Sequence, residues 1–178
     1  MNHLRIIKIL GFTALVIVVA LSVINAFPGL VGADYSFIVQ SGSMEPAIST
    51  GSMVFVEGIP PGQADERIEE GDVISFSKSG SITRTTTHRV VEKRSGEITD
   101  SVSFVTKGDA NENRDGEPVL RDEIVGKVMF DVPLMGYVAR FAGTSTGLAV
   151  LVILPMTLLF MDGLWQVYLA IEPEEDGE

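Results

Sequence analysis

The sequence predicts a mainly β domain flanked by an N-terminal and a C-terminal transmembrane helix. Two long apolar runs without a charged residue lie near the ends of the 178-residue chain. Between them, short runs rich in Val, Ile, Phe and Thr alternate with glycine-containing turns, which is the pattern of short β-strands. A chain of this length has room for one ordinary domain in addition to the two end segments.

The first apolar run predicts a membrane anchor over residues 9–27. Arg5 and Lys8 precede it, and the next charged residue is Asp34. A helix needs about 20 residues to cross a bilayer, whereas the apolar core of a cleaved secretory signal usually has about 7 to 15. The length therefore favours a retained anchor, with a cleaved signal as the alternative. Basic residues on the short N-terminal side then predict that residues 1–8 are cytoplasmic and that the chain lies outside from residue 28 onward.

The second apolar run predicts a further transmembrane helix over residues 144–161. Apolar side chains fill it on every side without a polar stripe, which favours lipid over the alternative, a buried helix of a soluble core. Pro155 predicts a kink in this helix. The chain then returns inside and ends in an acidic tail, residues 162–178, whose composition is typical of a disordered segment.

The domain between the anchors, residues 28–142, is expected to be extracytoplasmic and rich in β-strands. The strand-like runs cover residues 53–57, 72–77, 83–92, 102–107 and 124–130. Residues 59–71 begin with prolines and continue with four acidic residues, which indicates a solvated loop between strands.

Composition excludes several classes of function. The chain contains no cysteine, so disulfides, thiolate metal sites and a catalytic cysteine are ruled out. Its net charge is -11 and no basic patch stands out. Nucleic acid is therefore not expected as a partner.

Ser43 is the candidate nucleophile. It lies shortly after the first apolar run in Ser41-Gly42-Ser43-Met44-Glu45-Pro46, where a flexible glycine and a stiffening proline flank a turn that can present a hydroxyl. A serine hydroxyl reacts poorly unless a base removes its proton. The segment alone also fits an ordinary surface loop, so the interpretation depends on a base elsewhere in the chain.

His88 is the candidate base. The only other histidine, His3, lies in the short N-terminal tail. His88 stands in a β-branched run, where strand alternation puts it on one face with Thr86 and Val90. An imidazole can take a serine proton near neutral pH and later give it to a leaving amine. The alternative is a solvent-facing histidine of a strand.

The polar loop from Thr106 to Gly116 supplies two candidate acids, Asp109 and Asp115. Either carboxylate could accept a hydrogen bond from the imidazole N–H and leave the other ring nitrogen free as the base. The loop also resembles the start of a calcium-binding loop, but Arg114 occupies the position that needs glycine and Leu120 the position that needs a bidentate glutamate. No metal site is therefore expected, and a plain turn rich in Asp and Asn is the alternative.

Three ordered motifs resemble those of the type I signal peptidases, and more narrowly the archaeal and endoplasmic-reticulum branch in which histidine replaces the bacterial catalytic lysine. The motifs are Ser41-Gly42-Ser43-Met44-Glu45-Pro46, Thr87-His88-Arg89-Val90 and Lys107-Gly108-Asp109-Ala110-Asn111. The resemblance runs from the first anchor to about Tyr137. Ala110 stands where the family usually has an asparagine.

The resemblance implies a signal-peptidase-like β domain and assigns a role to each candidate residue. Ser43 would be the nucleophile, His88 the general base, Asp115 the acid that orients the histidine and Asp109 a supporting catalytic acid. The Ser41 hydroxyl and the Ser43 backbone N–H would form the oxyanion hole.

The implied activity is that of a multi-pass membrane serine endopeptidase that removes N-terminal signal peptides after small residues, at Ala-x-Ala-like sites, on the outer face of the cell membrane. Its partners would be preproteins that carry signal peptides and the lipid bilayer, with the protein-export translocon as a further candidate. Neither a metal nor an organic cofactor is expected.

Two other functions remain open from the sequence. One is a regulatory Ser/Lys peptidase, in which Lys78, Lys93 or Lys107 would serve as the base. The other is a non-catalytic membrane subunit whose β domain binds exported chains or assembly partners. The first predicts activity without His88, and the second predicts that Ser43 is dispensable.

Overall fold

The computed structural model describes residues 3–82, 84–95 and 102–171, in two compact units. One unit is Ile24–Tyr137, and the other combines Met1–Val23 with Val138–Glu178. The helices are α1 (His3–Ala26), α2 (Ala64–Arg67), α3 (Met135–Ala142), α4 (Ser145–Leu148) and α5 (Leu154–Ile171), with short 3₁₀ turns at Pro28–Val31, Gly42–Met44, Pro61–Gln63 and Arg121–Glu123. The strands are β1 (Tyr35–Ile38), β2 (Met53–Gly58), β3 (Val73–Phe76), β4 (Thr86–Ser95), β5 (Val102–Lys107), β6 (Val119–Leu120) and β7 (Ile124–Val132).

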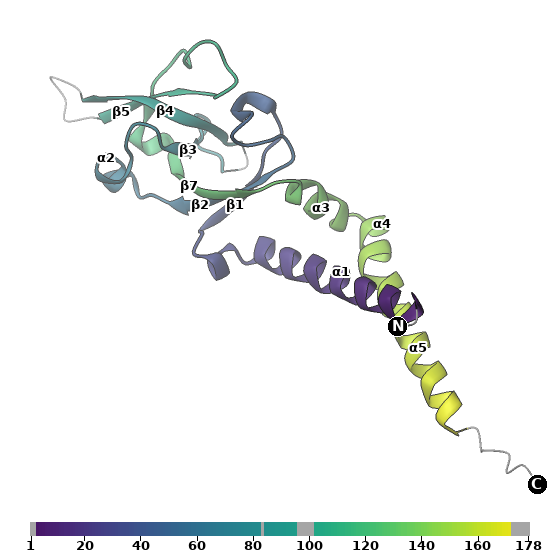
Figure 1. The fold of residues 1–178 in the computed structure, drawn as a ribbon. Helices are drawn as coiled ribbons and strands as arrows, with labels where there is room; N and C mark the ends of the chain where they lie inside the picture. Colours follow the sequence, from purple (N-terminus) through teal and green to yellow (C-terminus); the bar gives the residue numbers. More distant parts are fainter. Residues whose placement is uncertain (1–2, 83, 96–101, 172–178) are drawn as a thin grey trace, which may run out of the picture. The chain divides into compact units, whose positions relative to one another are not determined.

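The unit Ile24–Tyr137 is built on one antiparallel sheet, so the predicted mainly β domain is confirmed (Figure 1). Its strands lie in the order β1-β2-β7-β3-β4-β5-β6. All five predicted strand runs form strands, as β2, β3, β4, β5 and β7; Thr83, the predicted start of one run, lies outside the described residues. The short edge strands β1 and β6 were not predicted.

Three β-bulges interrupt the ladders of this sheet. Two lie in β7, at Met129 and at Val125, opposite Phe55–Val56 of β2 and Ser75–Phe76 of β3, and the third lies in β4 between Val90 and Glu92. A bulge bends its strand and increases the local twist. The third bulge lies in β4 two residues beyond His88, on the strand that carries the candidate base.

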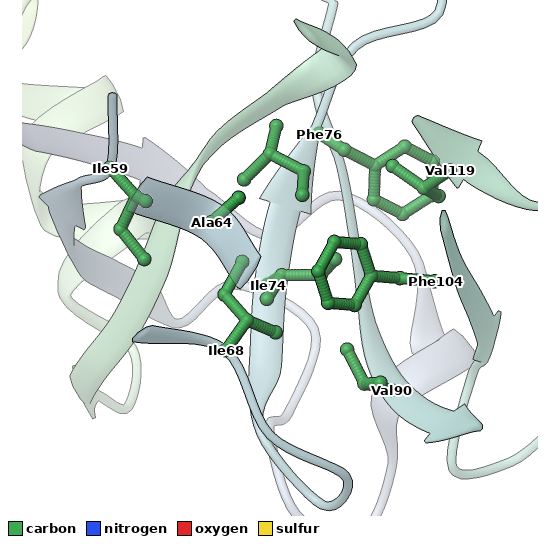
Figure 2. Close-up of a cluster of buried hydrophobic side chains, with 9 residues drawn as sticks. Ile59, Ala64, Ile68, Ile74, Phe76, Val90, Phe104 and Val119 are labelled. Atoms are coloured by element: carbon green, nitrogen blue, oxygen red, sulfur yellow. The ribbon is translucent and has the colours of Figure 1, made fainter. Parts of the chain in front are cut away.

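The expectation of a solvated loop over residues 59–71 is wrong for its apolar residues. Ile59, Ala64 and Ile68 are buried in the main core cluster. Figure 2 shows Ala64 and Ile68 from the α2 segment beside Ile74 of β3 and Phe104 of β5. The two prolines and the three glutamates of the segment are exposed, and they obscure the apolar positions when the sequence alone is considered.

Replacing Ile68 with alanine is therefore expected to lower the free energy of unfolding by about 2 to 5 kcal/mol, because the side chain is fully buried and its loss leaves a cavity. The measurement is urea unfolding of the chain in detergent, followed by circular dichroism. Glu66→Ala, at an exposed position of the same turn, is the matched control and should change stability by no more than about 0.5 kcal/mol. Equal effects of both substitutions would show that the segment is not part of the core.

The second unit contains the two apolar end segments. Among the described residues, one helix, Ser145–Tyr168, is long and apolar enough to cross a membrane, with 24 residues and a mean hydropathy of 2.1. The apolar stretch of α1, Gly11–Ala26, is shorter. Hydrogen bonding is π-helical over Ala149–Ile153, directly before the turn that contains Pro155, as expected near a proline without an N–H.

The C-terminal helix extends further than predicted. The apolar composition predicts that the segment ends at residue 161, but α5 continues to Ile171. Asp162 does not stop the helix, since its Oδ2 accepts a hydrogen bond from Gln166 Nε2 one turn later, at 2.8 Å. The remainder of the predicted acidic tail, residues 172–178, lies outside the described residues.

Candidate active site

Ser43, His88 and Asp115 lie in one hydrogen-bonded line. His88 Nε2 is 3.2 Å from Ser43 Oγ, and His88 Nδ1 is 2.7 Å from Asp115 Oδ2. The three residues are far apart in the sequence and come from different parts of the fold: the 3₁₀ turn after β1, strand β4 and the loop after β5. Because a carboxylate only accepts hydrogen bonds, Nδ1 donates to Asp115, and the neutral ring then offers Nε2 as the acceptor for the serine proton.

The backbone of Ser43 is fixed by its neighbour Met44. Met44 is buried in a second apolar cluster with Val54 and Val56 of β2. Its carbonyl accepts a hydrogen bond from Ile48 N at 2.9 Å, which closes the turn. Burying Met44 leaves the half-buried Ser43 to present its hydroxyl at the surface of the domain.

His88 is held by the interior of the sheet. It pairs with Ile74 of β3, and only 8% of its surface is exposed. The ring of Phe76 packs against the imidazole edge to face, at 6.3 Å between centroids. A strand side chain in such surroundings has a defined direction, so the ring is held between its two polar partners. The solvent-facing alternative for His88 is wrong.

Asp115 is held by Thr106 at the end of β5. Thr106 Oγ1 donates to Asp115 Oδ2 at 2.6 Å, and Asp115 N donates to the Thr106 carbonyl at 2.8 Å. These two bonds fold the polar loop back on the strand from which it leaves. Thr106 was not singled out from the sequence, since nothing distinguishes its hydroxyl from those of other strand threonines.

Asp109 lies against Arg89 and not against His88. Arg89 Nε and Nη2 donate to the two carboxylate oxygens of Asp109 at 2.8 and 2.6 Å, and Arg89 Nη1 donates to the Gly71 carbonyl at 2.8 Å. The hydrogen bonds to Asp109 hold the pKa of the Arg89 guanidinium above its ordinary value. The pair joins the polar loop to β4 one residue beyond His88. Its role in this geometry is to hold the loop in place.

Ser41 lies beside the candidate nucleophile. Its hydroxyl is exposed and is 3.3 Å from Ser43 Oγ. A donor next to the attacking oxygen is in the region where a tetrahedral intermediate would carry its negative charge.

The polar loop also contacts the nucleophile loop directly. Ala110 N donates to the Ser43 carbonyl at 2.9 Å. Since this bond uses the backbone, the alanine at a position where the family usually has asparagine leaves it intact. Gly108 is buried at the same junction, where a Cβ would lie 2.5 Å from the Ser43 carbonyl oxygen.

A methyl group at Gly108 should therefore displace the Ser43 loop. We expect Gly108→Ala to lower the rate of any Ser43-dependent reaction about 100-fold, since a displacement of about 1 Å at a reacting group can cost that much. Gly116→Ala is the matched control, because a Cβ there meets no atom within 4 Å. Equal rates for the two variants, measured with the same substrate, would contradict the claim that a Cβ at Gly108 displaces the Ser43 loop.

A groove runs past Ser43 and His88 within the sheet unit. Its volume is about 670 Å³. It is lined by residues of β1, of the Ser43 turn and of the start of β4, among them Phe37, Ile38, Val39, Ser41, Ser43, Met44, Thr86, Thr87 and His88. β1 is the terminal strand of the sheet, so one of its edges has no strand partner among the described residues. The groove could receive an extended chain along that edge.

Within the described ranges, no three His, Asp or Glu side chains are arranged to hold a metal ion. Asp109, the first position of the calcium-like sequence, is paired with Arg89. The expectation of a cofactor-free reaction remains a prediction.

A β domain with a hydroxyl, an imidazole and a carboxylate in line has the side-chain arrangement of the Ser-His-Asp class of hydrolases. The chain is 30% identical over 124 residues to signal peptidase I W of Bacillus subtilis (strain 168), an alignment that covers 67% of this chain and 61% of that protein. It is 33% identical over 123 residues to the signal peptidase complex catalytic subunit sec11 of Aspergillus terreus, covering 57% and 61%.

It is also 30% identical over 142 residues to the signal peptidase complex catalytic subunit SEC11C of Homo sapiens, covering 74% of this chain and 69% of that protein. No family model matches the chain. These similarities show that the chain belongs to the signal peptidase family. Its alignments span about three fifths of the length of the Bacillus and Aspergillus relatives.

Proposed function

We propose that this protein is a membrane-bound serine endopeptidase that removes signal peptides from exported preproteins by forming an acyl-enzyme. The observation that carries the proposal is the line of contacts from Ser43 Oγ to His88 Nε2, at 3.2 Å, and from His88 Nδ1 to Asp115, at 2.7 Å. The names of the related proteins support the same activity.

In the proposed reaction, Ser43 Oγ attacks the carbonyl carbon of the scissile peptide bond while His88 Nε2 takes the hydroxyl proton. Asp115 keeps the ring oriented and stabilises the imidazolium that forms. The Ser41 hydroxyl and the Ser43 backbone N–H donate to the oxyanion. When the tetrahedral intermediate collapses, His88 gives its proton to the leaving amine. Water, activated by His88, then hydrolyses the ester and regenerates the Ser43 hydroxyl.

The substrate is proposed to be an extended segment that ends in small residues. An extended chain can add to the open edge of β1, where its backbone pairs with the strand and alternate side chains point into the groove. Phe37, Val39 and Met44 line that groove. The specificity for small residues at Ala-x-Ala-like sites is proposed from the resemblance to the signal peptidases.

The bilayer is the proposed second partner. We propose that residues 9–27 and a second segment, which begins near residue 144 and continues past the expected end at 161, span it. Residues 1–8 and the end of the chain after this second span would lie inside, and residues 28–142 would carry the site on the outer face. Ser145–Tyr168 has the length and hydropathy for the second span. Anchoring would raise the effective concentration of a substrate held in the same membrane.

Further partners follow from the relatives. Several of them are named as catalytic subunits of a signal peptidase complex. We propose that this chain also acts next to other proteins of the export machinery, with the protein-export translocon as the candidate partner.

A lysine-dependent peptidase is the weaker candidate. Lys78 Nζ donates to Glu117 Oε2 at 2.8 Å, and Lys93 Nζ donates to the carbonyls of Asp65 and Ile68. Both ammonium groups are engaged away from Ser43, whose hydroxyl contacts His88.

The test is cleavage of a preprotein reconstituted in liposomes by the purified full chain, with the new N-terminus identified by mass spectrometry. Cleavage at one bond after a small residue is the expected result. A chain that binds the preprotein but leaves it intact would overturn the proposal in favour of a non-catalytic subunit.

A further inference from the structure

Thr106 makes a contact that packing alone does not explain. The residue is fully buried at the end of β5. It pairs with Val90 of β4, and Val90 belongs to the apolar core. A hydroxyl buried at such a position costs free energy unless it is hydrogen-bonded, and its partner is the carboxylate of Asp115.

The Thr106 hydroxyl contacts the same carboxylate oxygen of Asp115 that His88 contacts. Oδ2 of Asp115 accepts both from Thr106 Oγ1, at 2.6 Å, and from His88 Nδ1, at 2.7 Å. Asp115 N is held by the Thr106 carbonyl at 2.8 Å. Thr106 thus restrains Asp115 at its backbone and at its side chain, and the shared oxygen is the one that has to be aimed at the imidazole.

The restraint matters because Asp115 lies on a loop that is mostly exposed. Its neighbours Arg114 and Gly116 are both exposed, while Asp115 itself is half-buried. A carboxylate on such a loop could rotate away from the histidine and offer its oxygens to water. A buried strand is a rigid support, and a group held from it is aimed more precisely than one held only by its loop.

We propose that Thr106 is a positioning residue for the reaction, acting through Asp115 on the orientation of His88. This inference rests on the proposed function, and it adds a fourth member to the line Ser43, His88, Asp115. The hydroxyl is the active feature: it orients Oδ2, which orients Nδ1–H and leaves Nε2 facing Ser43.

The kinetic test compares Thr106→Val, which keeps the shape and removes the donor, with Thr106→Ser, which keeps the donor and removes a methyl group. We expect Thr106→Val to lower kcat about 10- to 100-fold with KM changed by less than about twofold, since loss of a group that orients a site residue has effects of this size. Thr106→Ser should retain kcat within about threefold.

Ser75→Ala is the matched control for lost stability. Its buried hydroxyl bonds Thr87 Oγ1 at 2.8 Å, so the variant also loses a buried hydroxyl bond, but it should keep kcat. Normal kcat in Thr106→Val, or equal losses in Thr106→Val and Thr106→Ser, would overturn the proposal.

A second readout does not depend on catalysis. The chain has two histidines, so a His3→Gln background leaves one imidazole for proton NMR. The Nδ1–H that donates to Asp115 should give a downfield resonance in the parent and in Thr106→Ser, and this resonance should be lost or broadened in Thr106→Val. An unchanged resonance in Thr106→Val would refute the positioning role. A changed resonance in a chain that cleaves nothing would instead show that the proposed function fails while the positioning contact exists.

Discussion

Replacement of Ser43 by alanine is expected to abolish preprotein cleavage, with a loss of at least about 10⁴-fold in rate. The reason is that, among the described contacts, no other hydroxyl is hydrogen-bonded to His88 Nε2. The substitution removes one oxygen atom from a half-buried position. Folding should therefore be unchanged, and the variant should still bind the preprotein. The measurement is single-turnover cleavage in liposomes, with binding followed separately by co-sedimentation.

Two variants make the Ser43 experiment specific. Ser49→Ala, at an exposed serine a few residues further along the chain, should keep the parental rate. His88→Ala should match Ser43→Ala, because residues that act as one unit lose their joint effect when any one is removed. If His88→Ala retained activity and Lys107→Met lost it, the lysine-dependent peptidase would become the better account.

Asp115→Asn is expected to lower kcat by about 10⁴-fold, the second largest effect. An asparagine amide can turn its NH₂ group toward Nδ1, which then becomes the acceptor. The ring proton moves to Nε2, and this nitrogen can no longer take the Ser43 proton. KM should change little, since Asp115 does not line the groove that contains Ser43.

Asp109→Asn is the matched control for the acid. It lies on the same loop, but its carboxylate contacts Arg89. Loss of that pair should loosen the loop and lower kcat by no more than about tenfold, because the loop is still joined to Ser43 by the Ala110 backbone bond. A larger loss for Asp109→Asn than for Asp115→Asn would reverse the roles that the geometry supports.

The β-strands can be predicted from the sequence, and so can the candidate pair Ser43 and His88, because each of these features depends on a local sequence pattern. β-branched runs between glycines predict strands wherever they pack. Ser43 was marked by its motif, and His88 by being the one histidine between the apolar runs. The short strand β1 lacked such a pattern, because only four residues pair with β2 and all are half-buried.

The choice between the two acids was decided by strand register. Asp109 and Asp115 lie on one loop, and spacing alone left both open as the partner of His88. The pairing of Arg89 with Lys107 brings Asp109, two residues later, beside the guanidinium. The backbone bond from Asp115 to Thr106 turns the loop back and brings the second carboxylate to the imidazole.

The sequence by itself determined the mainly β character of the middle of the chain, the apolar end segments and the family motifs, since each is a property of neighbouring residues. Only the tertiary structure decided which acid reaches His88, that Thr106 holds that acid, and that Ile59, Ala64 and Ile68 belong to the core. These features depend on which strands pair and in which register. Such contacts join residues far apart in the chain, and a local pattern does not specify them.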